Sequence, residues 1–184
     1  NGPARMRPVA ALGDRTFGSL RRHRNYRLYF VGNGISFIGT WMQQIAAYWL
    51  ILELTESPIA VGALALVQTL PITVLALVGG SIADRVELRR WIISCECVLA
   101  MIAATLAVLA LTDVIAAWQL YVLGFVQGVT IALDLPARHT LVFQIVGRDD
   151  LPNAVALGSA LGTSARIIGP ALGGLVVAAA GAGV

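Results

Sequence analysis

The stretch GGSIADRVELRR, Gly79 to Arg90, is a short charged segment between two long apolar ones. The apolar segment before it, Ile59 to Ile82, contains no Asp, Glu, Lys or Arg, and the one after it, Trp91 to Leu111, contains only Glu96. A helix needs roughly 20 apolar residues to cross the hydrocarbon core of a bilayer, and each segment has about that length. Because a basic turn between two such helices is typical of the cytoplasmic side, the stretch predicts two membrane-spanning helices joined by a cytoplasmic loop.

Composition extends this prediction to the whole chain. Of the 184 residues, 58% are hydrophobic and only 12% are charged, and the mean hydropathy is +0.79. Soluble domains are roughly half apolar and about a quarter charged, so the composition indicates an integral membrane protein. The two cysteines, Cys95 and Cys97, point to different faces of one apolar segment, so we expect neither a disulfide nor a metal site there.

The alternation of apolar and polar segments divides the rest of the chain. Residues 1–27 form a basic N-terminal tail with seven arginines and a single acidic residue, Asp14. Residues 134–151 form a longer polar connection. The pattern predicts an all-α transmembrane domain over residues 28–184, with spans at about 28–52, 59–82, 91–111, 114–133 and 152–180.

The placement of arginine orients these spans. The tail, the loop at residues 85–90 and the connection at residues 138–148 carry twelve of the 13 basic residues, all of them Arg. The turns on the opposite side carry none. Because positive charge accumulates on cytoplasmic loops, we expect a multi-pass protein of the plasma (inner) membrane with a cytoplasmic N-terminus. This topology accounts for the net charge of +3, so we expect no nucleic-acid partner.

Polar residues recur inside the predicted spans. Asn33, Ser36, Thr40 and Gln44 are spaced by three or four residues and share one face of the first span, and Gln127 lies in the fourth. Polar groups are costly against lipid, so we expect these side chains to line a water-filled cavity. The alternative is hydrogen bonding between helices without any ligand.

Two charged residues also lie within spans. Glu96 is little more than one turn inside the third span, where it could snorkel, pair with a loop arginine or carry a proton. Arg166 lies near the centre of the fifth span. A lone charge at that depth is costly, so we expect Arg166 to have a partner or to face a wet cavity.

Small residues mark places where helices can approach closely. Gly124 and Gly128 form a GxxxG pair in the fourth span, a motif that favours close contact between helices. The fifth span carries a longer stripe of small residues at the same kind of spacing. Its members are Gly158, Gly162, Ala165, Gly169 and Gly173.

Two motifs resemble those of the major facilitator superfamily of transporters. The first is that family's loop signature between spans two and three, matched here by Gly80, Asp84, Arg85, Arg89 and Arg90. The second is the GPxxGG signature of its exporter (antiporter) branch, matched by Gly169, Pro170, Gly173 and Gly174. The segments DLPAR and LPNAVALGSALGTSARIIGPALGG are similar to the enterobactin-exporter-like branch. In the fourth span, Gly124 stands where the family's proton-coupling signature has Arg.

The resemblance implies a fold and a function. The chain would supply five transmembrane helices of an N-terminal six-helix major facilitator half, and the missing C-terminal half would be its partner within the bilayer. The implied function is proton-coupled efflux of amphipathic small molecules such as drugs or siderophores. Asp84 would contact the other half and act in gating. In such a transporter, Arg166 would be a buried charge near the transport pathway, as its depth in the fifth span suggests.

Other functions remain open at this point. The same fold could take up a solute, or the chain could be a truncated, non-transporting membrane protein that associates with partners through its small-residue faces. The sequence contains no HExxH, P-loop or GxSxG motif, so we do not expect an enzyme. We also expect no cofactor and no metal ion.

Overall fold

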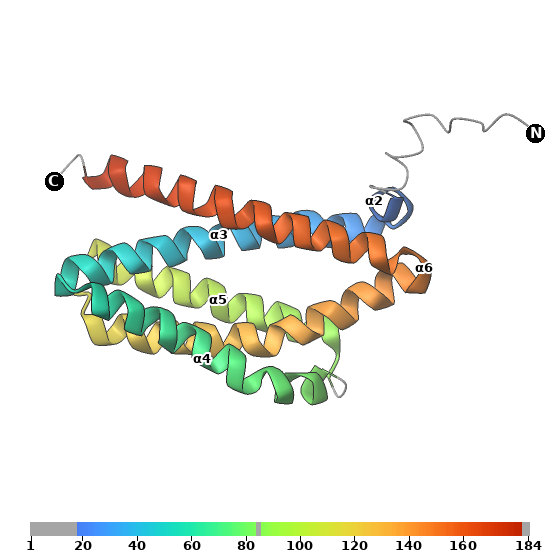
Figure 1. Cartoon of the computed structure of the whole chain (residues 1–184), viewed down its shortest axis with the longest axis horizontal. Helices are drawn as coiled ribbons and strands as arrows, with labels where there is room; N and C mark the ends of the chain where they lie inside the picture. Colours follow the sequence, from blue (N-terminus) through green and yellow to red (C-terminus); the bar gives the residue numbers. More distant parts are fainter. Residues whose placement is uncertain (1–17, 84–85, 182–184) are drawn as a thin grey trace, which may run out of the picture.

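The protein is built from long helices, shown in Figure 1. In a computed structural model, the structure describes residues 18–83 and 86–181, with side chains at all of these except 76–83, 177 and 179–181. All regular elements within this part of the chain are helical. They are α2 (Gly18–Arg22), α3 (Arg24–Thr55), α4 (Pro58–Ala83), α5 (Leu88–Leu111) and α6 (Ala117–Gly181).

α6 is bent at Gly147 into two arms. Gly147 has φ 71° and ψ −176°, a backbone conformation that is essentially restricted to glycine. The helix therefore stops and restarts at this residue. In Figure 1 the second arm turns back and runs alongside α3, whereas the first arm lies beside α4 and α5.

The prediction of a polar connection over residues 134–151 is wrong. This segment is helical except at Gly147, and Pro136 and Pro152 both lie inside α6. Only part of its polar composition reflects exposure, as at Arg148 and Asp149. Asp134 and Arg138 are buried and bind each other one turn apart, so their charges are compensated within the helix packing.

Four helices of the described chain are long and apolar enough to cross a membrane: Arg24–Thr55, Pro58–Leu75, Leu88–Leu111 and Ala117–Val176. The last of these contains the bend, and each of its arms exceeds the roughly 20 residues that a span requires. Large apolar side chains such as Ile59, Leu111 and Leu175 are exposed on the outer faces, as expected where the solvent is lipid. The protein is therefore an all-α membrane protein. The end of the N-terminal tail and the points at which the spans meet the membrane surface remain predictions.

The first arm of α6 crosses α4 at very short range. A Cβ atom at Gly128 would lie 2.2 Å from the carbonyl oxygen of Gln68, and one at Gly124 would lie 3.0 Å from Cδ1 of Leu64. The GxxxG pair thus allows the close contact that its spacing predicts. Beyond this crossing, Ile51, Leu64 and Leu120 form a buried apolar cluster that joins α3, α4 and α6.

The second arm of α6 packs just as closely on α3. A Cβ atom at Gly169 would lie 2.4 Å from Cβ of Trp41, and one at Gly173 would lie 3.2 Å from the carbonyl oxygen of Met42. Ala165 is 1% exposed. Gly158, at the start of the predicted stripe, has open space around its Cα. The stripe therefore forms a tight helix contact along only part of its length.

The end of the bundle near α2 is closed by contacts to the bend. Nε2 of His23 lies 3.0 Å from Oδ2 of Asp150, and Arg22 forms an ion pair of 3.0 Å with the same carboxylate. The Tyr26 hydroxyl donates to the carbonyl of Ala154 at 2.9 Å. These contacts tie α2 and the first turn of α3 to the start of the second arm, so the arm is fixed at the bend as well as along α3.

Candidate functional site

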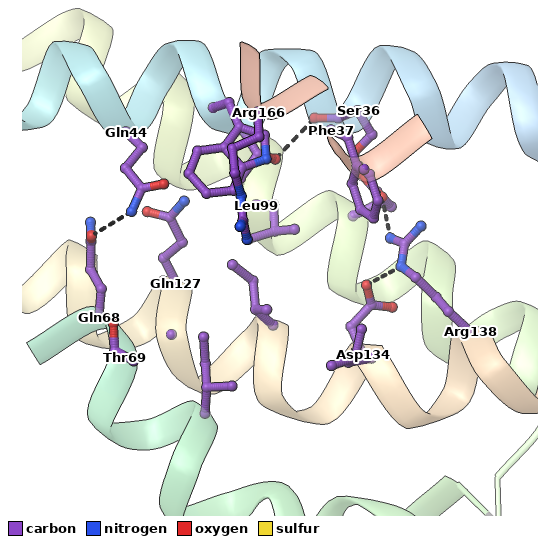
Figure 2. Close-up of a pocket in the computed structure, with 18 of the residues that line it drawn as sticks. Ser36, Phe37, Gln44, Gln68, Thr69, Leu99, Gln127, Asp134, Arg138 and Arg166 are labelled. Atoms are coloured by element: carbon purple, nitrogen blue, oxygen red, sulfur yellow. Dashed lines mark hydrogen bonds and ion pairs between the residues drawn. The ribbon is translucent and has the colours of Figure 1, made fainter. Parts of the chain in front are cut away.

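A cavity of about 570 Å³ lies among the four spanning helices. Figure 2 shows three glutamines at one end of it, Gln44, Gln68 and Gln127, and the charged pair Asp134 and Arg138 at the other. The apolar part of the wall comes from α3, α4, α5 and the first arm of α6. Its members are Phe37, Trp41, Ile72, Leu99, Ile131 and Leu135.

The polar stripe of α3 faces this cavity. Ser36, Thr40 and Gln44 line it, as does Gln127 from α6. Asn33, one turn before Ser36, is 9% exposed and is held by Arg138 instead of lining the cavity wall. The stripe thus has both of the roles that its sequence left open, because three members line the cavity and Asn33, Ser36 and Gln44 form hydrogen bonds to neighbouring helices.

The glutamine end of the cavity is a small hydrogen-bond network. The Tyr48 hydroxyl donates to Oε1 of Gln68 at 3.1 Å, and Nε2 of Gln44 donates to the Tyr48 oxygen at 2.8 Å. Because Gln44 and Tyr48 belong to α3 and Gln68 to α4, the network joins these two helices across the cavity. It also fixes the amide groups that a ligand would meet there.

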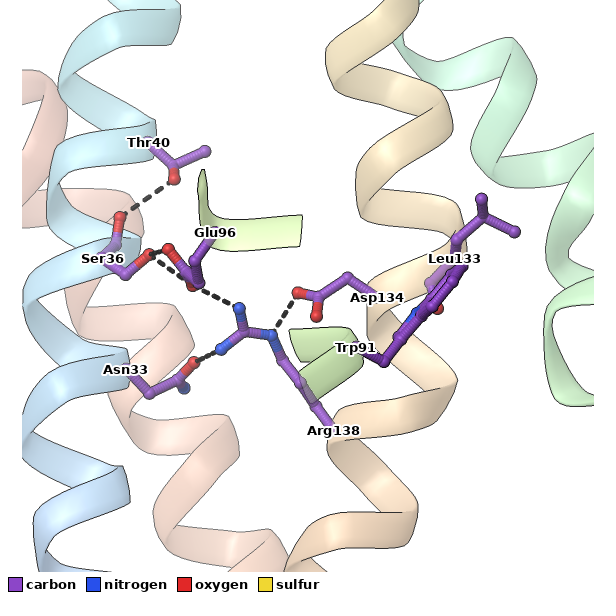
Figure 3. Close-up of polar contacts among 8 residues, drawn as sticks. All are labelled: Asn33, Ser36, Thr40, Trp91, Glu96, Leu133, Asp134 and Arg138. Atoms are coloured by element: carbon purple, nitrogen blue, oxygen red, sulfur yellow. Dashed lines mark hydrogen bonds and ion pairs between the residues drawn. The ribbon is translucent and has the colours of Figure 1, made fainter. Parts of the chain in front are cut away.

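The opposite end is organised by one arginine, as Figure 3 shows. The Arg138 guanidinium donates from Nε to Asp134, from one terminal nitrogen to Asn33 and from the other to Glu96. Its side chain is 9% exposed, compared with 7% for Asp134 and 35% for Glu96. We call Arg138, Asp134, Glu96 and Asn33 the charged cluster. It connects α3, α5 and the first arm of α6.

Glu96 is the member of the charged cluster most open to the cavity. Both of its carboxylate oxygens lie 2.9 Å from the Ser36 hydroxyl, which donates to them. The expectation that Glu96 would pair with an arginine is therefore met by Arg138, although this arginine lies on a helix and not in a loop.

Asp134 has a free acceptor within the charged cluster. Its Oδ2 accepts from Arg138, but the buried Oδ1 has no hydrogen-bond partner among the described residues. The residue also lines the cavity. An unsatisfied buried acceptor is costly, so this oxygen is a place where water or a donor from a ligand would bind favourably.

Arg166 lies on the opposite side of the cavity from Asp134. The carbon of its guanidinium is 4.9 Å from the centroid of the Trp41 ring, a cation–π contact. Arg166 lines the cavity, and it forms no ion pair within residues 18–83 and 86–181. The expectation that it would either have a partner or face a cavity is met by both an aromatic ring and the cavity.

The two family motifs are described to different extents. Asp84 and Arg85 lie outside the described residues, and Gly80 belongs to the last turn of α4. Arg89 and Arg90 are exposed in the first turn of α5, where Arg90 pairs with Glu87 at 2.9 Å. In the GPxxGG motif, Gly169 and Gly173 contact α3, Pro170 continues the helix, and a Cβ atom at Gly174 would meet open space.

Sequence reasoning missed part of the site. In the sequence, Arg138 contributes only to the arginine distribution that orients the spans, and Trp41 is not singled out. The available signal was the pair Asp134 and Arg138, spaced by four residues directly after an apolar span. That spacing places both side chains on one helix face, where an ion pair forms.

The comparisons with known proteins agree with this geometry. The family model described as transmembrane secretion effector matches residues 15–184. The chain belongs to this family of major facilitator transporters. Within the family, it is 32% identical over 160 residues to the MFS-type transporter YfiS of Bacillus subtilis, an alignment that covers 86% of this chain and 37% of that protein.

Other relatives of this family member have named activities. It is 30% identical to the multidrug efflux pump Tap of Mycolicibacterium fortuitum, over 82% of this chain and 36% of that pump. It is 26% identical to the enterobactin exporter EntS of Salmonella typhimurium, over 88% of this chain and 39% of that exporter. The chain thus spans less than two fifths of the length of these relatives. No solved structure matches it.

Proposed function

We propose that this chain is the N-terminal part of a secondary active transporter that exports amphipathic small molecules, such as drugs or siderophores, in exchange for protons. The observation that supports this function best is the cavity of about 570 Å³, whose size falls in the range of about 300–1,000 Å³ typical of small-molecule sites. Its wall combines apolar and aromatic faces with amides and with charges of both signs. Such a wall suits molecules that carry both apolar and polar groups.

The position of the cavity supports transport rather than catalysis or simple anchoring. It lies among spanning helices and is only partly enclosed by them, so a second six-helix half could complete the pathway. The relatives named as efflux pumps and siderophore transporters favour export and these substrate classes. We place the spans in the inner membrane and the N-terminus on its cytoplasmic side because of the arginine distribution.

The loop that contains Asp84 would gate this pathway. A carboxylate at the inner end of α4 can accept hydrogen bonds from a helix N-terminus of the second half and so hold the transporter open to the outside. Arg89 and Arg90, both exposed at the start of α5, are available to the same interface or to anionic lipid headgroups. Packing of Gly169 and Gly173 on α3 would keep the closed pathway tight.

An efflux assay tests the proposed function. The protein from the complete gene is produced in a bacterium that lacks its own main efflux pumps, and the accumulation of ethidium and of a macrolide is measured with and without a protonophore. We expect lower accumulation than in the vector control, and loss of the difference when the protonophore collapses the proton gradient. Asp84→Asn should reduce efflux at equal protein level.

The same assay separates the alternatives. Higher accumulation than in the vector control would show uptake and contradict export. No change for any compound, with the protein present in the membrane, would favour a non-transporting membrane protein. Efflux that persists unchanged after addition of the protonophore would contradict proton coupling and leave export standing.

A further inference from the structure

The charged cluster has an excess of negative charge inside a membrane protein. Glu96 and Asp134 are two carboxylates that share a single arginine, Arg138, so the cluster carries one uncompensated negative charge when both acids are ionised. An uncompensated charge is costly within a membrane-spanning domain. Binding of one proton would make the cluster neutral.

The hydrogen-bond count of the cluster leads to the same conclusion. Arg138 supplies one donor each to Glu96, Asp134 and Asn33, and Ser36 supplies a further donor to Glu96. Oδ1 of Asp134 is buried without a hydrogen-bond donor among the described residues, although the residue itself lines the cavity. The cluster thus contains a carboxylate oxygen without a donor as well as an uncompensated negative charge.

We propose that the charged cluster is the proton-coupling site of this transporter, with Glu96 as the residue that takes up and releases the proton and Arg138 with Asp134 as its fixed counter-charges. This inference rests on the proposed function and deepens it, because it names the site at which the exchanged proton would bind. The assignment to Glu96 follows from the different environments of the two acids.

Glu96 is accessible and Asp134 is not. The Glu96 side chain is 35% exposed and lines the cavity, whereas that of Asp134 is 7% exposed. Arg138 and Asp134 lie on the same helix four residues apart, so their ion pair persists when helices move relative to one another. Glu96 belongs to α5 and meets Arg138 across a helix interface. The ion pair of Glu96 with Arg138 is therefore the one that can open when the helices move.

Ser36 is suited to both protonation states of Glu96. Its hydroxyl now donates to the two carboxylate oxygens, each at 2.9 Å. When a proton from cavity water forms an O–H bond to Glu96, the same hydroxyl can rotate and accept from the carboxylic acid. On release, the proton returns to water and the carboxylate again pairs with Arg138. No other group has to move for the hydrogen bonds to remain satisfied.

The other titratable groups around Glu96 do not take over this role. The phenol of Tyr29 on α3 and the thiol of Cys95 on α5 interact electrostatically with it. Neither lines the cavity, and Arg166, which does, is a permanent cation. The residues of α4 that line the cavity, such as Gln68 and Thr69, do not titrate.

Proton uptake at Glu96 would have a structural consequence. The ion pair of Glu96 with Arg138 and the hydrogen bond of Arg138 with Asn33 together hold α5, α6 and α3 at one end of the cavity. Neutral Glu96 attracts the guanidinium less strongly, so the polar contact between α5 and α6 weakens there, while Ile92 still packs on Ala137. This gives the transporter an element with two arrangements whose equilibrium depends on the proton.

Infrared difference spectroscopy on the purified protein from the complete gene tests the assignment without any substrate. Acidification of the wild-type protein should produce the carbonyl band of a protonated carboxylic acid in an apolar site, and this band should shift in deuterated buffer. Glu96→Gln should abolish the band. Asp134→Asn should still form it on acidification, and Glu87→Gln, at an exposed acid that pairs with Arg90, should leave it unchanged.

Each outcome decides the matter. A band that persists in Glu96→Gln, or one that disappears in Asp134→Asn but not in Glu96→Gln, would overturn the assignment to Glu96. If Glu96→Gln does not fold, Glu96→Asp serves instead, because it keeps the charge and should shift the band without removing it. If the wild type shows proton-driven efflux but no band that depends on Glu96, this inference is wrong and the proposed function stands. If the band is present but no efflux is detected, the proposed function is wrong.

Discussion

The backbone of α6 at Gly128 lies directly against the carbonyl oxygen of Gln68 on α4. A Cβ atom at this position would be 2.2 Å from that oxygen and 3.0 Å from its carbonyl carbon. Because the obstacle is backbone, no side-chain rotation relieves the clash. The crossing of α4 and α6 therefore depends on the absence of a side chain at residue 128, and it sets the position of Gln68 and Gln127 at the cavity wall.

Gly128→Ala should separate α4 from α6 and destabilise the protein. Overpacking a tight contact costs about 1–3 kcal/mol, and the absence of a movable neighbour places this change toward the upper end. The midpoint of thermal denaturation of the detergent-solubilised protein measures the effect. Gly62→Ala, in α4 with nothing near its added Cβ, is the matched control and should be neutral or slightly stabilising. Equal midpoints for the two variants would contradict the close crossing.

The GPxxGG motif contains its own control. At Gly169 an added Cβ would lie 2.4 Å from Cβ of Trp41, and at Gly174 it would meet open space. Gly169→Ala should therefore push the second arm of α6 away from α3, lower the denaturation midpoint and disturb the contact of Trp41 with Arg166. Gly174→Ala should change none of these. Similar decreases in the denaturation midpoint for the two variants would contradict this difference and show that both glycines serve the same helix contact.

The bend at Gly147 is a second position that requires glycine, for a conformational reason. Its φ of 71° and ψ of −176° lie in a region that other L-residues occupy only at a cost of about 1–3 kcal/mol. There is open space around it, so the strain in Gly147→Ala comes from the backbone alone. We expect lower stability for Gly147→Ala than for Gly158→Ala, a helical glycine that is also in open space. Equal stability would show that the bend relaxes without difficulty.

Arg166 should matter for transport more than for folding. Its one aromatic contact, with Trp41, stabilises by about 0.5–1 kcal/mol where the site is open to solvent, so Arg166→Ala should lower the denaturation midpoint only slightly. Because its guanidinium lines the cavity, the same variant should export less in the efflux assay. Arg148→Ala, an exposed arginine next to the bend, is the control. Normal export by Arg166→Ala at equal protein level would remove its role in the pathway.

The sequence predicted the helices well and the site only in part. Runs such as residues 59–82 and 91–111 are predominantly apolar, and a bilayer leaves such segments little alternative to helix, so hydropathy alone identifies them. The stripe from Asn33 to Gln44 was found because its period matches one helix face. These signals are local, and local signals can be read without knowing which helices are neighbours.

The charged cluster required information that is not local. Arg138 meets Glu96 and Asn33, which precede it by 42 and 105 residues, and nothing in the sequence specifies these pairings. Polarity predicts a connection between spans over residues 134–151, because exposed and buried charges look alike in a sequence. The spacing of Asp134 and Arg138 by four residues was the one sign that this polar segment continues a helix.

Arg138 should be the most sensitive charged residue for folding. Removing one partner from a buried ion pair costs about 3–5 kcal/mol because the remaining charge is left uncompensated, and Arg138→Met would leave both Glu96 and Asp134 in this state. We expect a strong loss of folded protein in fluorescence-detected gel filtration, compared with no loss for Arg89→Met at an exposed position. Combining Arg138→Met with Glu96→Gln and Asp134→Asn should restore most of the folded yield, since an uncharged cluster has no charge left to compensate. Failure of this triple change to recover the yield, with Arg138→Met alone well folded, would show that the cluster is not held together by charge.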